Sequence, residues 1–183
     1  MMKKFYVILF LVLGVITFAQ SVKDLDAKNG FRHIKLGSHI SEFKGVLEES
    51  DFLSERANVK TYNYIGGDIK ELFGVKINSV SLYFYKNELF FIYLGFEDPF
   101  ELHHYMDLKK NISNSYGNKT FYARNSNGSV VNGAIWQGEK VRMELNRVDH
   151  TKHKYKPIDY EYTTGYMVII HRELRKKEND DNL

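Results

Sequence analysis

The chain has 183 residues, 15% of them aromatic, with 26 Lys and Arg against 23 Asp and Glu and no cysteine. This length and aromatic content suit one domain with a core of its own, which excludes a disordered secreted segment. The absence of cysteine excludes disulfides, thiolate zinc sites, cysteine nucleophiles and the acylated cysteine of a lipoprotein. The net charge is only +3 and the two dense basic stretches, 152–156 and 172–177, are short, so nucleic acid is not an expected partner.

Residues 1–19 have the pattern of a secretory signal peptide. Lys3 and Lys4 precede an apolar run from Phe5 to Phe18, and Thr17-Phe18-Ala19 fits a cut before Gln20. The run is shorter than the roughly 20 residues that span a bilayer, and polar residues follow it at once. We therefore predict an exported protein, periplasmic or extracellular, with no stable membrane anchor in its mature form.

The first half of the mature chain predicts one helix followed by strands. Residues 20–30 are polar and predict a loose lead-in. Ser38 is a candidate N-cap, and apolar residues then recur at helical spacing as far as Ser50. A strand is expected over 59–65, whereas 69–73 is ambiguous between a loop and one helical turn.

A β-hairpin is the strongest secondary-structure prediction. Strands over 80–85 and 89–96 flank a short turn at 86–88. The second strand is apolar on both faces, with Leu89, Phe91 and Tyr93 expected on one and Phe90, Ile92, Leu94 and Phe96 on the other. Such a strand is either central in a covered sheet or part of a patch for a partner or an apolar ligand.

The second half predicts a better-marked helix and four strands. Asp98 is the expected cap, Pro99 the first helical residue and Glu101 the capping-box carboxylate. The helix presents Leu102, Tyr105, Leu108, Ile112 and Tyr116 on one face and ends at Gly117. Strands follow over 120–123, 130–136, 140–148 and 166–171, and residues 175–183 predict a charged disordered tail.

These elements predict an α+β fold with two helices packed on one or more antiparallel sheets. Residues 20–174 form one domain, with possible sub-blocks at 31–97 and 98–174 that repeat a helix-then-strands order. This tandem helix-plus-meander order after a signal peptide resembles β-lactamase-inhibitor protein and outer-membrane-assembly lipoproteins. The stretch Gly30–Ser38 resembles the opening of small bacterial exported proteins of unassigned function. The resemblance implies a binding or envelope role by analogy.

Candidate binding residues are aromatic. Tyr83, Tyr85 and Tyr93 would contribute to a patch on the hairpin, and Trp136 is expected at a strand end beside a turn, a position suited to an interface anchor. The alternative for each is ordinary packing in the sheet or core.

Histidines provide the candidates for other chemistry. His150 and His153 are the one pair with metal-ligand spacing, although Lys152, Lys154 and Lys156 oppose a cation there. None of the common hydrolase motifs occurs.

The favoured hypothesis is a secreted, non-enzymatic protein that binds a protein or another envelope macromolecule without a cofactor. The alternative is a secreted hydrolase that uses His103, His104 or His171 with a carboxylate. A third hypothesis is a homodimer that buries the apolar hairpin against its own copy.

Overall fold

A computed structural model describes residues 21–50, 56, 58–117, 119–126, 129–150 and 163–182. The predicted signal peptide lies outside the described residues. Within them the fold is α+β, as the sequence predicts: helices pack on one antiparallel sheet whose main path is β3-β4-β6-β7-β11-β10-β9-β8. No helix in these ranges has the length and apolar character that a bilayer crossing needs.

The sheet consists of two meanders that meet at their last strands. The first contains β3 (Leu47–Glu49), β4 (Val59–Tyr64), β6 (Val75–Tyr85) and β7 (Glu88–Phe96). The second contains β8 (Thr120–Ser126), β9 (Ser129–Gln137), β10 (Val141–Asp149) and β11 (Thr163–His171). Antiparallel pairing of β7 with β11 joins them. The short β5 (Glu71–Leu72) pairs with the start of β6, and β1 (Gly30–Phe31) and β2 (Ile34–Lys35) form a separate hairpin.

The predicted hairpin is confirmed, and β7 is a central strand between β6 and β11. Lys86 and Asn87 form its turn with φ of 49° and 69°, the left-handed values of a tight two-residue connection. A bulge shifts the register after Tyr83, so that Phe84 pairs with Leu89 while Tyr83 pairs with Phe91.

Because of this bulge, the side chains of β7 do not divide between the two sheet faces as the sequence predicts. Leu89 joins Ile92, Leu94 and Phe96 in the main core, whereas Phe90 packs with the residues of the opposite face. The extra residue in a bulged strand interrupts the alternation, so residues on the two sides of the bulge do not follow one series of alternating faces. A prediction that assumes strict alternation of side chains therefore fails there.

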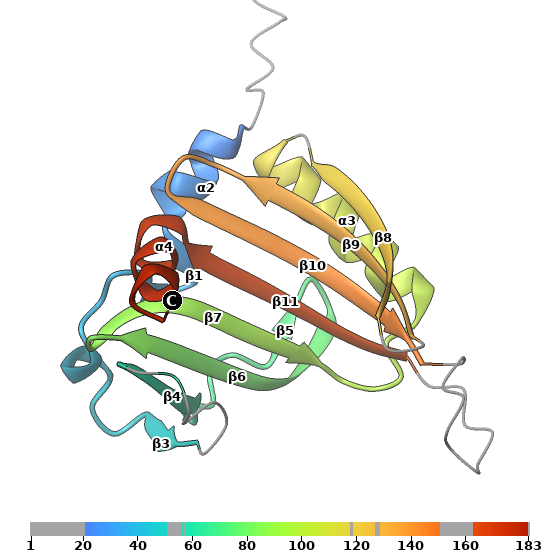
Figure 1. Ribbon diagram of the computed structural model, residues 1–183. Helices are drawn as coiled ribbons and strands as arrows, with labels where there is room; N and C mark the ends of the chain where they lie inside the picture. The colour runs from blue at the N-terminus through green and yellow to red at the C-terminus, as the bar shows by residue number, and fades with distance from the viewer. Residues whose placement is uncertain are drawn as a thin grey trace, which may run out of the picture.

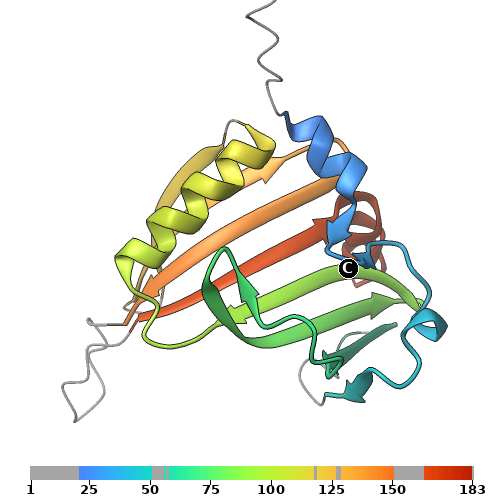
Figure 2. The same ribbon diagram turned by 180° about the vertical axis from the view of Figure 1, so that it is seen from behind.

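Helices cover the two faces of the sheet unequally. Helix α3 (Leu102–Tyr116) and helix α2 (Val22–Lys28) lie on one face, which encloses the main core (Figure 2). Helix α4 (Arg172–Asp181) lies on the other face, over one end of the central strands, and no other helix of the described chain covers that face (Figure 1).

Several predicted helix boundaries are wrong. The predicted helix from Ser38 is only a 3-10 turn, η1 (Ile40–Phe43), capped by His39. Gly45 then takes a φ of 78°, and residues 47–49 pair with β4 as strand β3. The ambiguous segment 69–73 contributes β5. In the second half, Glu101 rather than Asp98 caps α3, and Leu102 is its first residue and exposed.

The predicted disordered tail is also wrong, because residues 172–181 form α4. Leu174 and Glu178 are one turn apart and both buried, so they form the face that packs on the sheet. Two arginines bracket the Glu178 carboxylate, Arg56 at 3.1 Å and Arg175 at 3.0 Å. The high charge of the segment suggested disorder, but the buried carboxylate is paired in the folded protein.

The predicted loose lead-in contains α2, which anchors the turn between β9 and β10. Ser21 and Asp24 form a capping box, and Leu25 is fully buried. The Asp26 carboxylate accepts hydrogen bonds from the backbone N–H groups of Glu139, Lys140 and Val141 at 2.7–2.9 Å. Partial burial raises the pKa of Asp26, but these three donors outweigh it and hold the pKa below its usual value.

We expect Asp26→Ala to lower the free energy of unfolding by about 2 kcal/mol at pH 7, because it removes an ionised acceptor from three donors. Since the pKa of Asp26 is lower in the folded protein, its contribution is complete above the pKa of the unfolded chain. The contribution disappears as the pH falls through the folded value. Urea denaturation at pH 7 and pH 3 measures both effects.

Asp24→Ala is the matched control, because Asp24 is an exposed carboxylate of the same helix with one local hydrogen bond to the Ser21 N–H at 2.8 Å. Equal losses in the two variants at pH 7, or an Asp26→Ala loss that persists unchanged at pH 3, would contradict this role.

Candidate binding face

The sheet face opposite α2 and α3 carries rows of aromatic side chains at successive levels. The register aligns Tyr122, Gly133, Asn146, Tyr166 and Gly95 in one row across β8, β9, β10, β11 and β7. The next row contains Tyr93 and the one after it contains Phe91. We call the four partly exposed rings of these rows the aromatic face: Phe91, Tyr93, Tyr122 and Tyr166.

Ring contacts order the aromatic face. Tyr93 and Tyr166 stack with centroids 5.6 Å apart and planes 21° from parallel. Phe91 meets Tyr83 edge-on at 4.9 Å. Aromatic pairs in these geometries contribute about 1 kcal/mol each beyond the area they bury. The rings are therefore held in place before any partner arrives.

Glycine at Gly133 makes room for Tyr122. A Cβ atom built on Gly133 would lie 2.2 Å from the ring carbon Cζ of Tyr122. The tyrosine ring thus lies flat across the neighbouring strand, and any larger residue at position 133 would push it outward.

A buried polar group stands at the centre of the face. Asn146 is 1% exposed, and the Tyr122 hydroxyl donates to its Oδ1. Beside it, the Glu144 carboxylate accepts from the Arg142 Nε at 2.6 Å. Burial, followed by the negative charge of Glu144, raises the pKa of Tyr122 to about 12. The tyrosine hydroxyl therefore stays protonated, and so remains a donor, at neutral pH.

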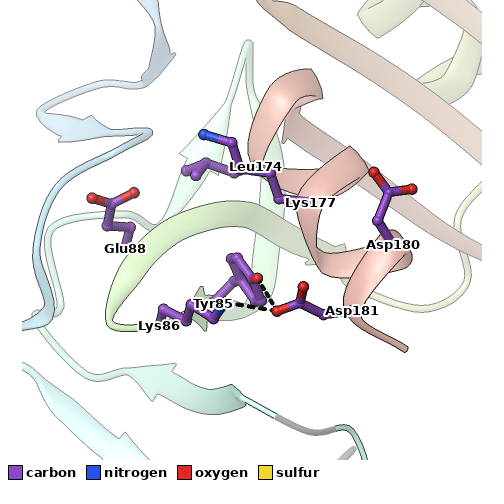
Figure 3. Close-up of a pocket in the computed structure, with 7 residues that line it drawn as sticks. All are labelled: Tyr85, Lys86, Glu88, Leu174, Lys177, Asp180 and Asp181. Carbon is purple, nitrogen blue, oxygen red and sulfur yellow. Dashed lines mark hydrogen bonds and ion pairs between the residues drawn. The ribbon is translucent and has the colours of Figure 1, made fainter. Parts of the chain in front are cut away.

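Helix α4 closes one end of this face. Leu174 packs in a cluster with Phe90 and Tyr85, and the Arg175 guanidinium lies 5.8 Å from the Phe90 ring centroid. At the C-terminal end of α4, Asp181 accepts from the Tyr85 hydroxyl and pairs with Lys86 Nζ at 2.7 Å (Figure 3). The groove around these contacts measures about 450 Å³ and is lined by both signs of charge.

The structure separates the four predicted binding residues. Tyr93 lies on the aromatic face and is partly exposed, while Tyr83 lies beside it but is only 8% exposed. Tyr85 is 4% exposed and lies under α4.

Of the two alternatives for Trp136, packing in the core is confirmed and the interface anchor is wrong: Trp136 is fully buried in the main core on the other face. Its strand position is close to a turn, as expected, but its side chain pairs across the sheet with Met143 and points inward. A contact role for Trp136 is therefore excluded.

The sequence analysis placed Phe91 on the same strand face as Tyr93 but missed Tyr122 and Tyr166 as their partners. The alternation of these rings with core residues could have predicted which face they occupy. For example, the adjacent residues Phe121 and Tyr122 must point to opposite faces of β8. Bringing the rings into adjacent rows required the strand order, in particular the pairing of β7 with β11.

The histidine candidates occupy structural positions. The ring nitrogens of His150 lie 3.2 Å from Ser129 Oγ and 3.0 Å from Thr164 Oγ1. His153 lies outside the described residues, and no cluster of three His, Asp or Glu side chains suited to a metal occurs within them.

The three histidines of the hydrolase hypothesis do not converge. The His171 ring accepts from the Leu174 N–H at the start of α4, and burial lowers the pKa of His171. His103 and His104 lie with ring centroids 4.0 Å apart on α3, on the other side of the sheet.

A family model, the TP0088 domain, matches residues 29–167, which cover most of the domain including β1 and the central strands. The chain belongs to the TP0088 domain family. The family is one of uncharacterised proteins, so membership assigns no activity to the aromatic face. No curated protein and no solved structure matches the chain.

We expect Gly133→Ala to lower the free energy of unfolding by about 1–2 kcal/mol, because the added methyl group displaces the Tyr122 ring and leaves Asn146 Oδ1 without its donor. The double variant Gly133→Ala/Tyr122→Ala removes the clash, so its loss should be smaller than the sum of the two single losses. Urea denaturation of the four proteins in this cycle measures the coupling.

Ala134, the neighbouring core residue on β9, shows that the strand itself accommodates alanine. Strictly additive losses in the cycle would show that Gly133 is not required by the ring of Tyr122.

Proposed function

We propose that this TP0088 domain protein is an exported, non-enzymatic binding protein of the bacterial envelope and that its aromatic face contacts a partner protein. The observation that carries the proposal is the row arrangement of Phe91, Tyr93, Tyr122 and Tyr166, partly exposed on a sheet face that α4 covers only at one end.

The composition of this face is that of an interface. Tyrosine and phenylalanine are enriched in the central part of protein interfaces, where charged residues are depleted. Charged side chains adjoin the rings here: Arg124 is exposed 5.6 Å from the Tyr122 centroid, and the Arg142–Glu144 pair lies on β10, between β8 and β11. A partner would therefore meet aromatic rings on both sides of a polar strip.

The order of the rings favours binding. Tyr93 is stacked on Tyr166, and Tyr122 is held by Gly133 and Asn146. Side chains that are fixed beforehand lose little conformational entropy when a partner covers them, so more of the contact energy remains as affinity.

Export is supported by the sequence of residues 1–19, and an envelope role by the resemblance to β-lactamase-inhibitor protein and outer-membrane-assembly lipoproteins.

The test is a cross-linking pull-down from the native envelope fraction with the mature chain from Gln20 onward as bait. We expect one dominant protein partner, and we expect Tyr93→Ala and Tyr166→Ala each to weaken its binding by about tenfold or more, the loss typical of a central interface aromatic.

Phe121→Ala is the matched control. Phe121 is 56% exposed and adjacent in sequence to Tyr122, but it points to the α3 side of β8, where Lys109 Nζ lies 4.9 Å from its ring. Circular dichroism must show all three variants folded. Equal binding by the two tyrosine variants and the wild type, or an equal loss in Phe121→Ala, would rule out the aromatic face as the contact surface.

Light scattering separates a foreign partner from a second copy of the chain. If the molar mass of the wild type rises from monomer to dimer with concentration, while Tyr166→Ala stays a monomer, the partner is a second copy of the protein.

A further inference from the structure

A small cavity lies on the helix side of the sheet, away from the aromatic face. Its volume is about 210 Å³, and Met143 and Met167 of the sheet form its floor. The end of α3 contributes Ile112 and Tyr116 to one wall, and the β5–β6 turn contributes Phe73 to another. Lys28 of α2 and Arg32, which follows β1, also line it. The cavity thus collects side chains from five separate segments of the chain.

The lining of the cavity combines an apolar interior with positive charge. Leu72, Phe73, Ile112 and the two methionines present carbon and sulfur, while Lys28 and Arg32 supply two cations. The lining includes no carboxylate. Two unlike regions, one apolar and one cationic, match a ligand with an apolar body and one anionic end.

Arg32 is fixed in position by the backbone. Its guanidinium donates to the carbonyl oxygens of Asp68 and Glu71 at 2.9 and 2.7 Å. These bonds use part of its five N–H donors and attach the β5 segment to the β1–β2 hairpin. Remaining donors of a fixed guanidinium are suited to a carboxylate, and Lys28 at the end of α2 adds a second, exposed cation.

Phe73 is an outlier at the mouth of the cavity. It has a φ of 49°, in the left-handed region, and is followed by Gly74 with a φ of 80°. The first position of such a turn normally carries Asn, Asp or Gly, because a bulky side chain is strained there. The Phe73 ring is nevertheless 52% exposed, so the folded protein gains little burial from it. Contact with a bound ligand would compensate for the cost of placing this exposed aromatic ring in a strained turn at the cavity mouth.

The size of the cavity limits the ligand. At roughly 30 Å³ for each water-sized group it holds about seven of them, below the range of typical drug-sized sites. Methionine side chains are unbranched and flexible, so Met143 and Met167 can adapt to an aliphatic chain.

We infer that this cavity binds a medium-chain aliphatic carboxylate. Lys28 and Arg32 hold the carboxylate at the rim, and the chain passes Phe73 and Tyr116 to end on Met143 and Met167. This site is distinct from the aromatic face and does not depend on the proposed function of that face.

The test is titration of the purified protein with octanoate below its micelle concentration, followed by calorimetry and by the emission of Trp136. Trp136 is the only tryptophan of the chain and is paired with Met143, so a ligand on the cavity floor changes its surroundings. We expect saturable binding with a dissociation constant on the order of 0.1–1 mM. Octanol, which lacks the charge, should bind about tenfold more weakly.

Lys28→Gln should weaken octanoate binding by about tenfold, whereas Lys23→Gln, on an exposed position of the same helix, should leave it unchanged. Phe73→Asn should raise the melting temperature, because Asn tolerates the left-handed turn, and should weaken binding severalfold. The opposite signs of these two effects separate loss of a ligand contact from loss of the fold.

Absence of saturable binding would overturn the inference. Equal affinities for octanoate and octanol, or equal effects of Lys28→Gln and Lys23→Gln, would overturn the assignment of the carboxylate to the cationic rim. Tyr166→Ala must leave the titration unchanged, since a loss there would move the ligand to the aromatic face.

Discussion

The fold depends on strand β7, which contributes side chains to the packing on both faces and joins the two halves of the sheet. Leu89, Ile92 and Leu94 reach the main core beneath α2 and α3, while Phe90 reaches the cluster beneath α4. Strand β11 pairs with the edge of β7 that faces away from β6, so the last strands of the two meanders are hydrogen-bonded to each other. Each half alone would leave a row of backbone donors and acceptors unpaired at this seam. The continuity of the sheet therefore depends on one strand pairing.

The two faces of the sheet differ in how far their side chains are buried. The helix side buries the large apolar side chains, including Trp136, and contains a small cavity lined by apolar side chains and two cations. The other side exposes partly covered rings and orders them by stacking, by a glycine and by a buried amide. Because neighbouring residues of a strand point to opposite sides, Phe121 and Tyr122 belong to different surfaces although they are adjacent in sequence.

The sequence predicted the strands well, since alternation and turn residues are local signals. It failed where distant residues decide. Residues 172–181 carry many charges, and only the sheet surface and Arg56 explain why Glu178 is buried in a helix. The segment after Ser38 has helical spacing, but Gly45 and pairing with β4 override it. The aromatic face was predicted only through Phe91 and Tyr93 of one strand, because Tyr122 and Tyr166 join them through strand order.

The pairing of β7 with β11 also sets the order in which the chain becomes complete. Strands β6 and β7 are synthesised long before residues 163–171. The apolar hairpin therefore lacks its pairing partner β11 during most of synthesis. Contacts so distant in sequence form slowly, and an unpaired apolar edge invites association with other chains in the meantime. The pairing of β7 with β11, the last strand to be synthesised, is thus the step that completes the sheet.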